Sequence, residues 1–131
     1  MPDPVVLCVD DDPGMRGLYE AMFGRNGYQV IVVSNGDHAL TVYQFARNVD
    51  AVVLDREMPG MDGDELAERL KQLNPLLPIL MVSGTNPEIE EMSPFVDAAL
   101  AKGVPIRNIL DRIELLLAER EMPSARVELP I

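Results

Sequence analysis

Short, continuous runs of Val, Ile and Leu alternate along this chain with longer amphipathic stretches, and this alternation constrains its fold more than any other feature. Strands of a parallel sheet are buried on both faces and therefore form unbroken apolar runs. The helices that cover such a sheet are apolar on one side only. The pattern predicts an α/β fold in which a five-stranded parallel sheet is doubly wound by helices on both faces.

The limits of the predicted elements follow from the apolar runs and from the residues that start or stop helices. The predicted strands are Val5–Val9, Tyr28–Val33, Ala51–Leu54, Ile79–Val82 and a weaker Ala98–Ala101. The first predicted helix begins at Pro13 and stops before Asn26, the second covers Asp37–Arg47, and the third runs from the cap at Asp62 to Leu73. The fourth begins at Asn86-Pro87 and breaks near Pro94, and the fifth covers Ile106–Arg120.

Two of the predicted helices carry clear start signals. Asp12 is suited to be an N-cap and is followed by Pro13, which fits the first helical position. Asp62 and Glu65 have the spacing of a capping box. Apolar spacing assigns inward-facing residues to the first helix (Leu18, Tyr19, Met22, Phe23) and to the second (Ala39, Leu40, Val42, and Tyr43 or Phe45).

Composition favours one acidic domain. The chain has 131 residues, of which we assign 1–120 to the domain and 121–131 to a C-terminal tail. Its 22 acidic and 11 basic side chains give a net charge of −11, which disfavours binding to nucleic acid or to an anionic membrane surface. The single cysteine, Cys8, cannot form an intramolecular disulfide, and this is typical of a cytoplasmic protein.

Polar residues follow the carboxyl ends of four of the predicted strands. These residues are Asp10, Asp11, Asp55, Ser83 and Lys102. Because the carboxyl ends of parallel strands lie along one edge of the sheet, where such folds bind ligands, we expect these side chains to converge.

Carboxylates that converge in this way repel one another and require a cation or raised pKa values. Oxygen ligands without His or Cys suit a hard, partly hydrated divalent ion such as Mg²⁺. A magnesium site beside a lysine is suited to phosphate, and a carboxylate can itself be the nucleophile that forms an aspartyl phosphate.

Four segments together resemble the receiver domains of two-component response regulators. They are VDDDPGMR after the first strand, LDREMPGMDG after the third, VSG after the fourth and a lysine after the fifth. Residues 55–63 are the most specific part, because they match the family pattern D-x-x-M-P-x-x-x-G in full. The resemblance covers nearly the whole chain and implies a flavodoxin-like receiver fold.

The resemblance also implies roles for individual residues. Asp55 would be the phosphoacceptor and one of the Mg²⁺ ligands. Asp11 would bind the ion directly, Asp10 directly or through water, and Glu57 through its backbone carbonyl.

The remaining implied roles concern the phosphoryl group and the partners. Ser83 would donate a hydrogen bond to a phosphoryl oxygen, and Lys102 would form an ion pair with the group. The phosphodonor would be a histidine kinase or a histidine phosphotransfer protein, and the output would be contact with a downstream protein.

The chain departs from the family in one region. The family usually has an aromatic residue where this chain has Ala99, and a proline where it has Gly103. A cis bond to glycine would cost about 3 kcal/mol, so we expect a trans bond after Lys102 or a rearranged loop. The stretch between Ser83 and Lys102 is short, which predicts a short or distorted fourth helix ending around Pro94.

Our interpretation is a response regulator without an effector domain of its own, which is not an enzyme beyond its own phosphorylation and dephosphorylation. One alternative is a receiver fragment of a hybrid histidine kinase or of a multidomain regulator. Another is a magnesium-dependent phosphohydrolase with Asp55 as nucleophile. Such enzymes commonly have an acid/base aspartate at the position that Glu57 occupies here.

Overall fold

The computed structural model describes residues 2–46, 48–84 and 93–121. Five parallel strands form one sheet in the order β2-β1-β3-β4-β5, so the chain builds one edge, crosses back over β1 and builds the other edge. The elements are β1 (Val5–Val9), α1 (Pro13–Arg25), β2 (Gln29–Val33), α2 (Gly36–Ala46), β3 (Ala51–Asp55), α3 (Gly63–Leu73), β4 (Ile79–Ser83), β5 (Ala98–Ala101) and α4 (Ile106–Glu121).

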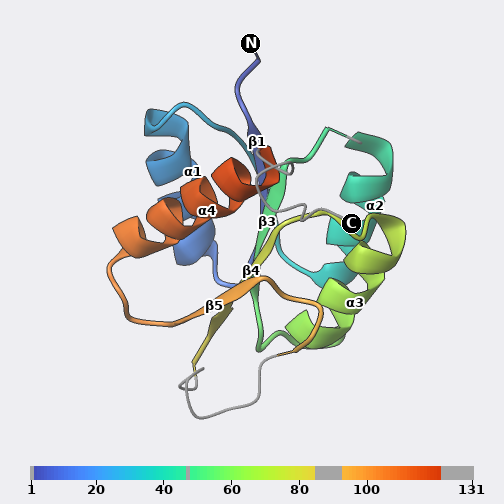
Figure 1. The fold of residues 1–131 in the computed structure, drawn as a ribbon. Helices are drawn as coiled ribbons and strands as arrows, with labels where there is room; N and C mark the ends of the chain where they lie inside the picture. Colours follow the sequence, from blue (N-terminus) through green and yellow to red (C-terminus); the bar gives the residue numbers. More distant parts are fainter. Residues whose placement is uncertain (1, 47, 85–92, 122–131) are drawn as a thin grey trace, which may run out of the picture.

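Helices cover both faces of the sheet, with α1 and α4 on one side and α2 and α3 on the other (Figure 1). Because side chains alternate along a strand, each buried strand supplies residues to two separate cores. In β1, Val5, Leu7 and Val9 join the core under α2 and α3. Val6 and Cys8 join the core under α1 and α4. The predicted doubly wound parallel sheet is therefore confirmed.

The predicted boundaries differ from the observed ones by no more than one residue in the elements that can be compared. The short helix predicted from Asn86-Pro87 falls largely on 85–92, outside the described residues, and Pro94 and Phe95 form a turn before β5. None of the helices in the described ranges combines the length and apolar character needed to cross a bilayer.

The first helix begins as its sequence indicates. The Asp12 carboxylate accepts a hydrogen bond of 2.9 Å from the Gly14 N–H. Tyr19 and Phe23 are buried against the sheet. Leu18 was also predicted to face inward, but this is wrong: its side chain is 52% exposed. Neighbouring helix positions point about 100° apart, and the buried stripe follows Tyr19 and Phe23, four residues apart.

The structure also decides two predictions about the second and third helices, namely which aromatic residue of α2 is buried and how α3 is capped. In α2, Tyr43 packs against the core and its hydroxyl accepts a hydrogen bond from Asn74, whereas Phe45 is 84% exposed. In α3, Asp62 caps the helix by accepting from the Glu65 N–H at 2.9 Å. The Glu65 carboxylate binds Arg69 instead of completing the capping box.

Candidate functional site

The strand order places the carboxyl ends of four strands side by side at one edge of the sheet. Asp10 and Asp11 follow β1, Asp55 ends β3, Ser83 ends β4 and Lys102 follows β5. One ligand oxygen each from Asp10, Asp11 and Asp55 lies within 4.8 Å of the other two. The structure therefore brings the three acidic residues singled out in the sequence into one group.

Backbone contacts hold Asp10 in place at the end of β1. Its N–H donates to the carbonyl of Val33, and its own carbonyl accepts from the Arg16 guanidinium. Its carboxylate accepts a hydrogen bond of 2.9 Å from the Asp12 N–H. Burial raises the pKa of the Asp10 carboxyl, and the nearby charge of Asp55 raises it further. The protein therefore holds an acidic group where its negative charge is unfavourable unless a cation is present.

Asp55 lies at the centre of the site and is only 2% exposed. Its Oδ1 atom is 3.0 Å from the Lys102 Nζ atom and accepts a hydrogen bond from the Glu57 N–H. Burial raises the pKa of the Asp55 carboxyl, although the contact with Lys102 opposes this. For Lys102, burial lowers the pKa, but the hydrogen bond and charge of Asp55 outweigh it, so the pKa rises. The lysine therefore stays charged beside Asp55.

In the loop after Asp55, the backbone at Gly63 packs closely against the backbone of Asp55 and Arg56. The Gly63 N–H donates to the Arg56 carbonyl at 2.9 Å. A Cβ atom at Gly63 would lie 2.6 Å from the Asp55 carbonyl oxygen, a distance that real Cβ atoms do not tolerate. The glycine at the end of the 55–63 motif is therefore required by the close backbone contacts within this loop.

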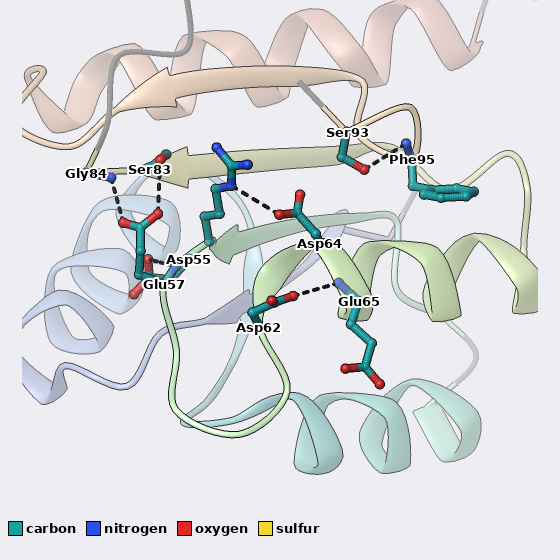
Figure 2. A network of polar contacts seen from close by, with 10 residues as sticks. Asp55, Glu57, Asp62, Asp64, Glu65, Ser83, Gly84, Ser93 and Phe95 are labelled. Carbon is teal, nitrogen blue, oxygen red and sulfur yellow. Dashed lines mark hydrogen bonds and ion pairs between the residues drawn. The ribbon is translucent and has the colours of Figure 1, made fainter. Parts of the chain in front are cut away.

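The Glu57 side chain makes contacts that the sequence did not predict. Figure 2 shows its carboxylate directed at the end of β4, where it accepts hydrogen bonds from the Ser83 hydroxyl at 3.0 Å and the Gly84 N–H at 2.7 Å. Its Oε1 atom also lies 3.7 Å from the Lys102 Nζ atom. From the sequence, Glu57 was expected to act chiefly through its backbone carbonyl. The signal available in the sequence was an acidic side chain two residues after the central aspartate.

The turn after Lys102 is built around glycine. The Lys102 N–H donates to the Ser83 carbonyl at 2.7 Å, which keeps the lysine close to the end of β4. Gly103 has a φ of 95°, in the region that residues with a Cβ atom rarely adopt. Among the described residues no peptide bond is cis, so the expected trans bond after Lys102 is confirmed.

A cavity of about 460 Å³ adjoins the site. Its polar lining includes the three grouped aspartates and Lys102. The apolar lining comes from α1, from the ends of β4 and β5, and from the segment that leads from β5 into the start of α4. The apolar lining residues are Met15, Leu18, Val82, Ala101, Val104, Ile106 and Ile109. Asp55 therefore lines a cavity that is bordered by both charged and apolar side chains.

A profile of the response regulator receiver domain matches residues 6–114. The autoinducer 1 sensor kinase/phosphatase LuxN of Vibrio campbellii is 33% identical over 101 residues, which are 76% of this chain and 12% of LuxN. The alkaline phosphatase synthesis transcriptional regulatory protein PhoP of Bacillus subtilis is 28% identical over 127 residues, which are 95% of this chain and 52% of PhoP.

The fold resembles that of solved receiver proteins. The response regulator TrrA of Thermotoga maritima in complex with Mg²⁺-BeF has a TM-score of 0.78 and 27% identity, covering 86% of this chain and 98% of TrrA. TrrA in complex with the histidine kinase ThkA has the same TM-score and 29% identity, covering 87% and 98%. Since the profile spans most of the sequence and the fold agrees with it, this chain belongs to the response regulator receiver domain family of two-component signalling.

Proposed function

We propose that this chain accepts a phosphoryl group on Asp55 in a Mg²⁺-dependent reaction and signals by contact with another protein. The observation that carries the proposal is the position of the buried Asp55 carboxylate. It belongs to a group of three carboxylates whose oxygens lie within 4.8 Å of one another, and it is also 3.0 Å from the Lys102 ammonium. A nucleophilic oxygen, a cation site and a fixed positive charge are the elements that phosphoryl transfer requires.

The donor set fits Mg²⁺. It consists of carboxylate oxygens from Asp10, Asp11 and Asp55, to which the backbone carbonyl of Glu57 would be added. Asp10 and Asp55 are buried with raised pKa values, whereas Asp11 is exposed, so the group is open to water on one side. Mg²⁺ prefers such oxygen ligands and keeps several waters. When bound, the ion supplies positive charge that stabilises the phosphoryl oxygens during transfer.

The reaction proposed for the protein groups is a simple displacement. An Asp55 carboxylate oxygen forms the new bond to phosphorus, and the phosphorus–nitrogen bond of a phosphohistidine breaks with its electron pair going to the imidazole nitrogen. Lys102 would move its ion pair from Asp55 to the phosphoryl oxygens, and the Ser83 hydroxyl would donate a hydrogen bond to one of them. The chain is not proposed to turn over a separate substrate, and loss of the group to water would return Asp55.

The proposed phosphodonor is a histidine kinase or a histidine phosphotransfer protein. This is supported by the complex of TrrA with the kinase ThkA. It is also supported by the cavity, because its lining combines Asp55 with apolar residues of the kind that a protein partner covers. A downstream protein would then recognise the phosphorylated chain, and we propose that both events take place in the cytoplasm.

We further propose that residues 1–120 act as the receiver module and 121–131 as a tail, which lies almost entirely outside the described residues. The chain spans 12% of LuxN and 52% of PhoP, so in those proteins the matching region is accompanied by other parts. A receiver module of a larger protein would carry out the same chemistry on Asp55.

The function is tested by incubating the protein with acetyl phosphate and Mg²⁺ and measuring its intact mass. The expected result is one added phosphoryl group, which is absent with a chelator and absent in Asp55→Asn. Asp62→Asn is the matched control, because it removes a carboxylate from the same loop and keeps the α3 cap. Labelling of Asp55→Asn at the wild-type level would refute the proposal. Continuous hydrolysis of a phosphate monoester would favour a phosphohydrolase instead.

A further inference from the structure

The carboxylate of Glu57 contacts three donors that come from two segments of the chain, the end of β4 and the residue after β5. Its two oxygens accept hydrogen bonds from the Ser83 hydroxyl at 3.0 Å and from the Gly84 N–H at 2.7 Å. The Lys102 Nζ atom lies 3.7 Å from the same oxygen that Gly84 binds. A hydroxyl, a backbone N–H and an ammonium are the groups that proteins use to bind the oxygens of a phosphoryl group.

These donors are also within reach of Asp55. Lys102 bridges the two carboxylates, because its Nζ atom is 3.0 Å from Asp55 Oδ1 as well as 3.7 Å from Glu57 Oε1. Ser83 ends β4, which pairs directly with β3, the strand that ends at Asp55. A phosphoryl group attached to Asp55 would therefore meet the donors that Glu57 now occupies.

We propose that the Glu57 carboxylate is an internal competitor for the phosphoryl site, which it must leave before a phosphoryl group on Asp55 can be bound. This inference rests on the proposed function. The carboxylate resembles the incoming group in charge and in having oxygens as acceptors, but it is tethered by its own side chain. Two negative groups sharing one ammonium repel each other, so binding of one group opposes binding of the other.

The exposure of Glu57 makes such an exchange possible. Its side chain is 47% exposed, so the carboxylate can swing into water without being left buried and unpaired. Asp55, by contrast, is fixed in the sheet and almost completely buried. The resting protein thus pairs a fixed acceptor with a movable acidic side chain, and only the movable one has to change position.

Beryllium fluoride with Mg²⁺ provides the test, because it binds aspartate as a non-covalent stand-in for a phosphoryl group. Its affinity is measured by isothermal titration calorimetry for the wild type, Glu57→Ala, Glu57→Gln and Glu65→Gln. Glu65 is the matched control, since its side chain is also 47% exposed and its carboxylate is bound to Arg69 away from the site. All variants are first checked by thermal unfolding.

Removal of the competitor should tighten binding. We expect Glu57→Ala to bind beryllium fluoride about tenfold more tightly than the wild type, which corresponds to about 1.4 kcal/mol. Glu57→Gln should lie between them, because it loses the charge but keeps an acceptor oxygen. Glu65→Gln should match the wild type. In the free Glu57→Ala protein the Gly84 amide proton should move to higher field by NMR, because it loses the carboxylate that accepts its hydrogen bond.

The contrary outcomes are distinct. If the wild type binds beryllium fluoride and Glu57→Ala binds it equally or more weakly, the inference is overturned while the proposed function stands. An equal gain in Glu65→Gln would also overturn it, because the effect would then be one of overall charge. If none of the four proteins binds beryllium fluoride, both the inference and the proposed function are refuted.

Discussion

Replacing Asp10 with Asn should stabilise the protein in the absence of Mg²⁺. The ligand oxygens of Asp10 and Asp55 lie within 4.8 Å, and both residues are buried. Two unit charges at that separation repel by about 3.5 kcal/mol at an effective dielectric constant of about 20. Asn keeps the oxygen that accepts from the Asp12 N–H at 2.9 Å, and its amide can donate to a neighbouring carboxylate.

The net gain is smaller than the repulsion, because the attraction between Asp10 and Lys102 is lost as well. We expect Asp10→Asn to raise the free energy of unfolding by about 1 to 2 kcal/mol, or the melting temperature by roughly 4 °C per kcal/mol for a domain of this size. The measurement is urea denaturation at pH 7 in the presence of a chelator. Asp12→Asn is the control, because it removes an exposed charge nearby and keeps the N-cap.

Magnesium should reverse the order of stability. A ligand that binds only the folded state stabilises it by about 2.7 kcal/mol at a concentration 100 times its dissociation constant. The wild type should gain this stabilisation from Mg²⁺, and Asp10→Asn should gain little. Lower stability of Asp10→Asn than of the wild type without Mg²⁺, or an equal gain in both proteins when the ion is added, would contradict a repulsion between Asp10 and Asp55 that Mg²⁺ relieves.

The same carboxylates predict a pH dependence of stability. The pKa values of Asp10 and Asp55 are raised above 3.8 in the folded protein, so the folded state binds more protons than the unfolded state in that window. Without Mg²⁺, the stability contributed by these two groups should therefore fall as pH rises from about 4 through their folded pKa values. The fall should be smaller in Asp10→Asn, as measured by urea denaturation across this range. A wild-type stability that rises by the same amount as that of the variant would contradict this assignment.

Substitutions at three other sites, Lys102, Gly63 and Gly103, have defined expectations. Lys102→Met should lower the free energy of unfolding without Mg²⁺ by about 1 kcal/mol, because Asp55 loses its ion pair at 3.0 Å. The loss is limited because the lysine side chain is partly exposed. An unchanged urea midpoint would contradict this expectation. Gly63→Ala should lower the free energy of unfolding by about 1 to 3 kcal/mol, because its Cβ atom would clash with the Asp55 carbonyl. Gly24→Ala, on the open surface of α1, should raise it by roughly 0.5 to 1 kcal/mol. Equal effects of the two substitutions in denaturant would rule out the steric explanation. Gly103→Val should lower the melting temperature because of its φ of 95°, and Gly103→Asn should do so less.

The layered fold could be predicted because local and global signals agree in this chain. Runs such as Ile79–Val82 are apolar at every position, which only a strand buried on both faces requires, and Asp12 and Asp62 mark helix starts by their own chemistry. Convergence of the polar strand ends then follows from the parallel arrangement. The apolar runs by themselves leave the order of the strands open, because nothing in a single run specifies which neighbour it pairs with. The observed order is that of the flavodoxin-like fold implied by the resemblance.

Details that depend on side-chain direction could not be read from the sequence. Leu18 and Tyr19 are adjacent apolar residues, and only the docking of α1 on the sheet decides that Tyr19 is buried. The same holds for Tyr43 and Phe45 in α2. The contacts of the Glu57 carboxylate depend on how close the loop after β3 lies to the end of β4. Tertiary structure sets that distance, and spacing along the chain does not.

A crystal structure of the wild type with Mg²⁺ and beryllium fluoride would show whether the grouped strand ends bind the ion and the phosphoryl analogue. We expect one ion bound by carboxylate oxygens of Asp11 and Asp55 and by the Glu57 backbone carbonyl, with Asp10 binding it directly or through water. Beryllium should lie on an Asp55 oxygen, with Lys102 against the fluorides. Density for the ion at another site, or beryllium fluoride away from Asp55 at saturating concentration, would contradict the claim that these strand ends form a phospho-accepting centre.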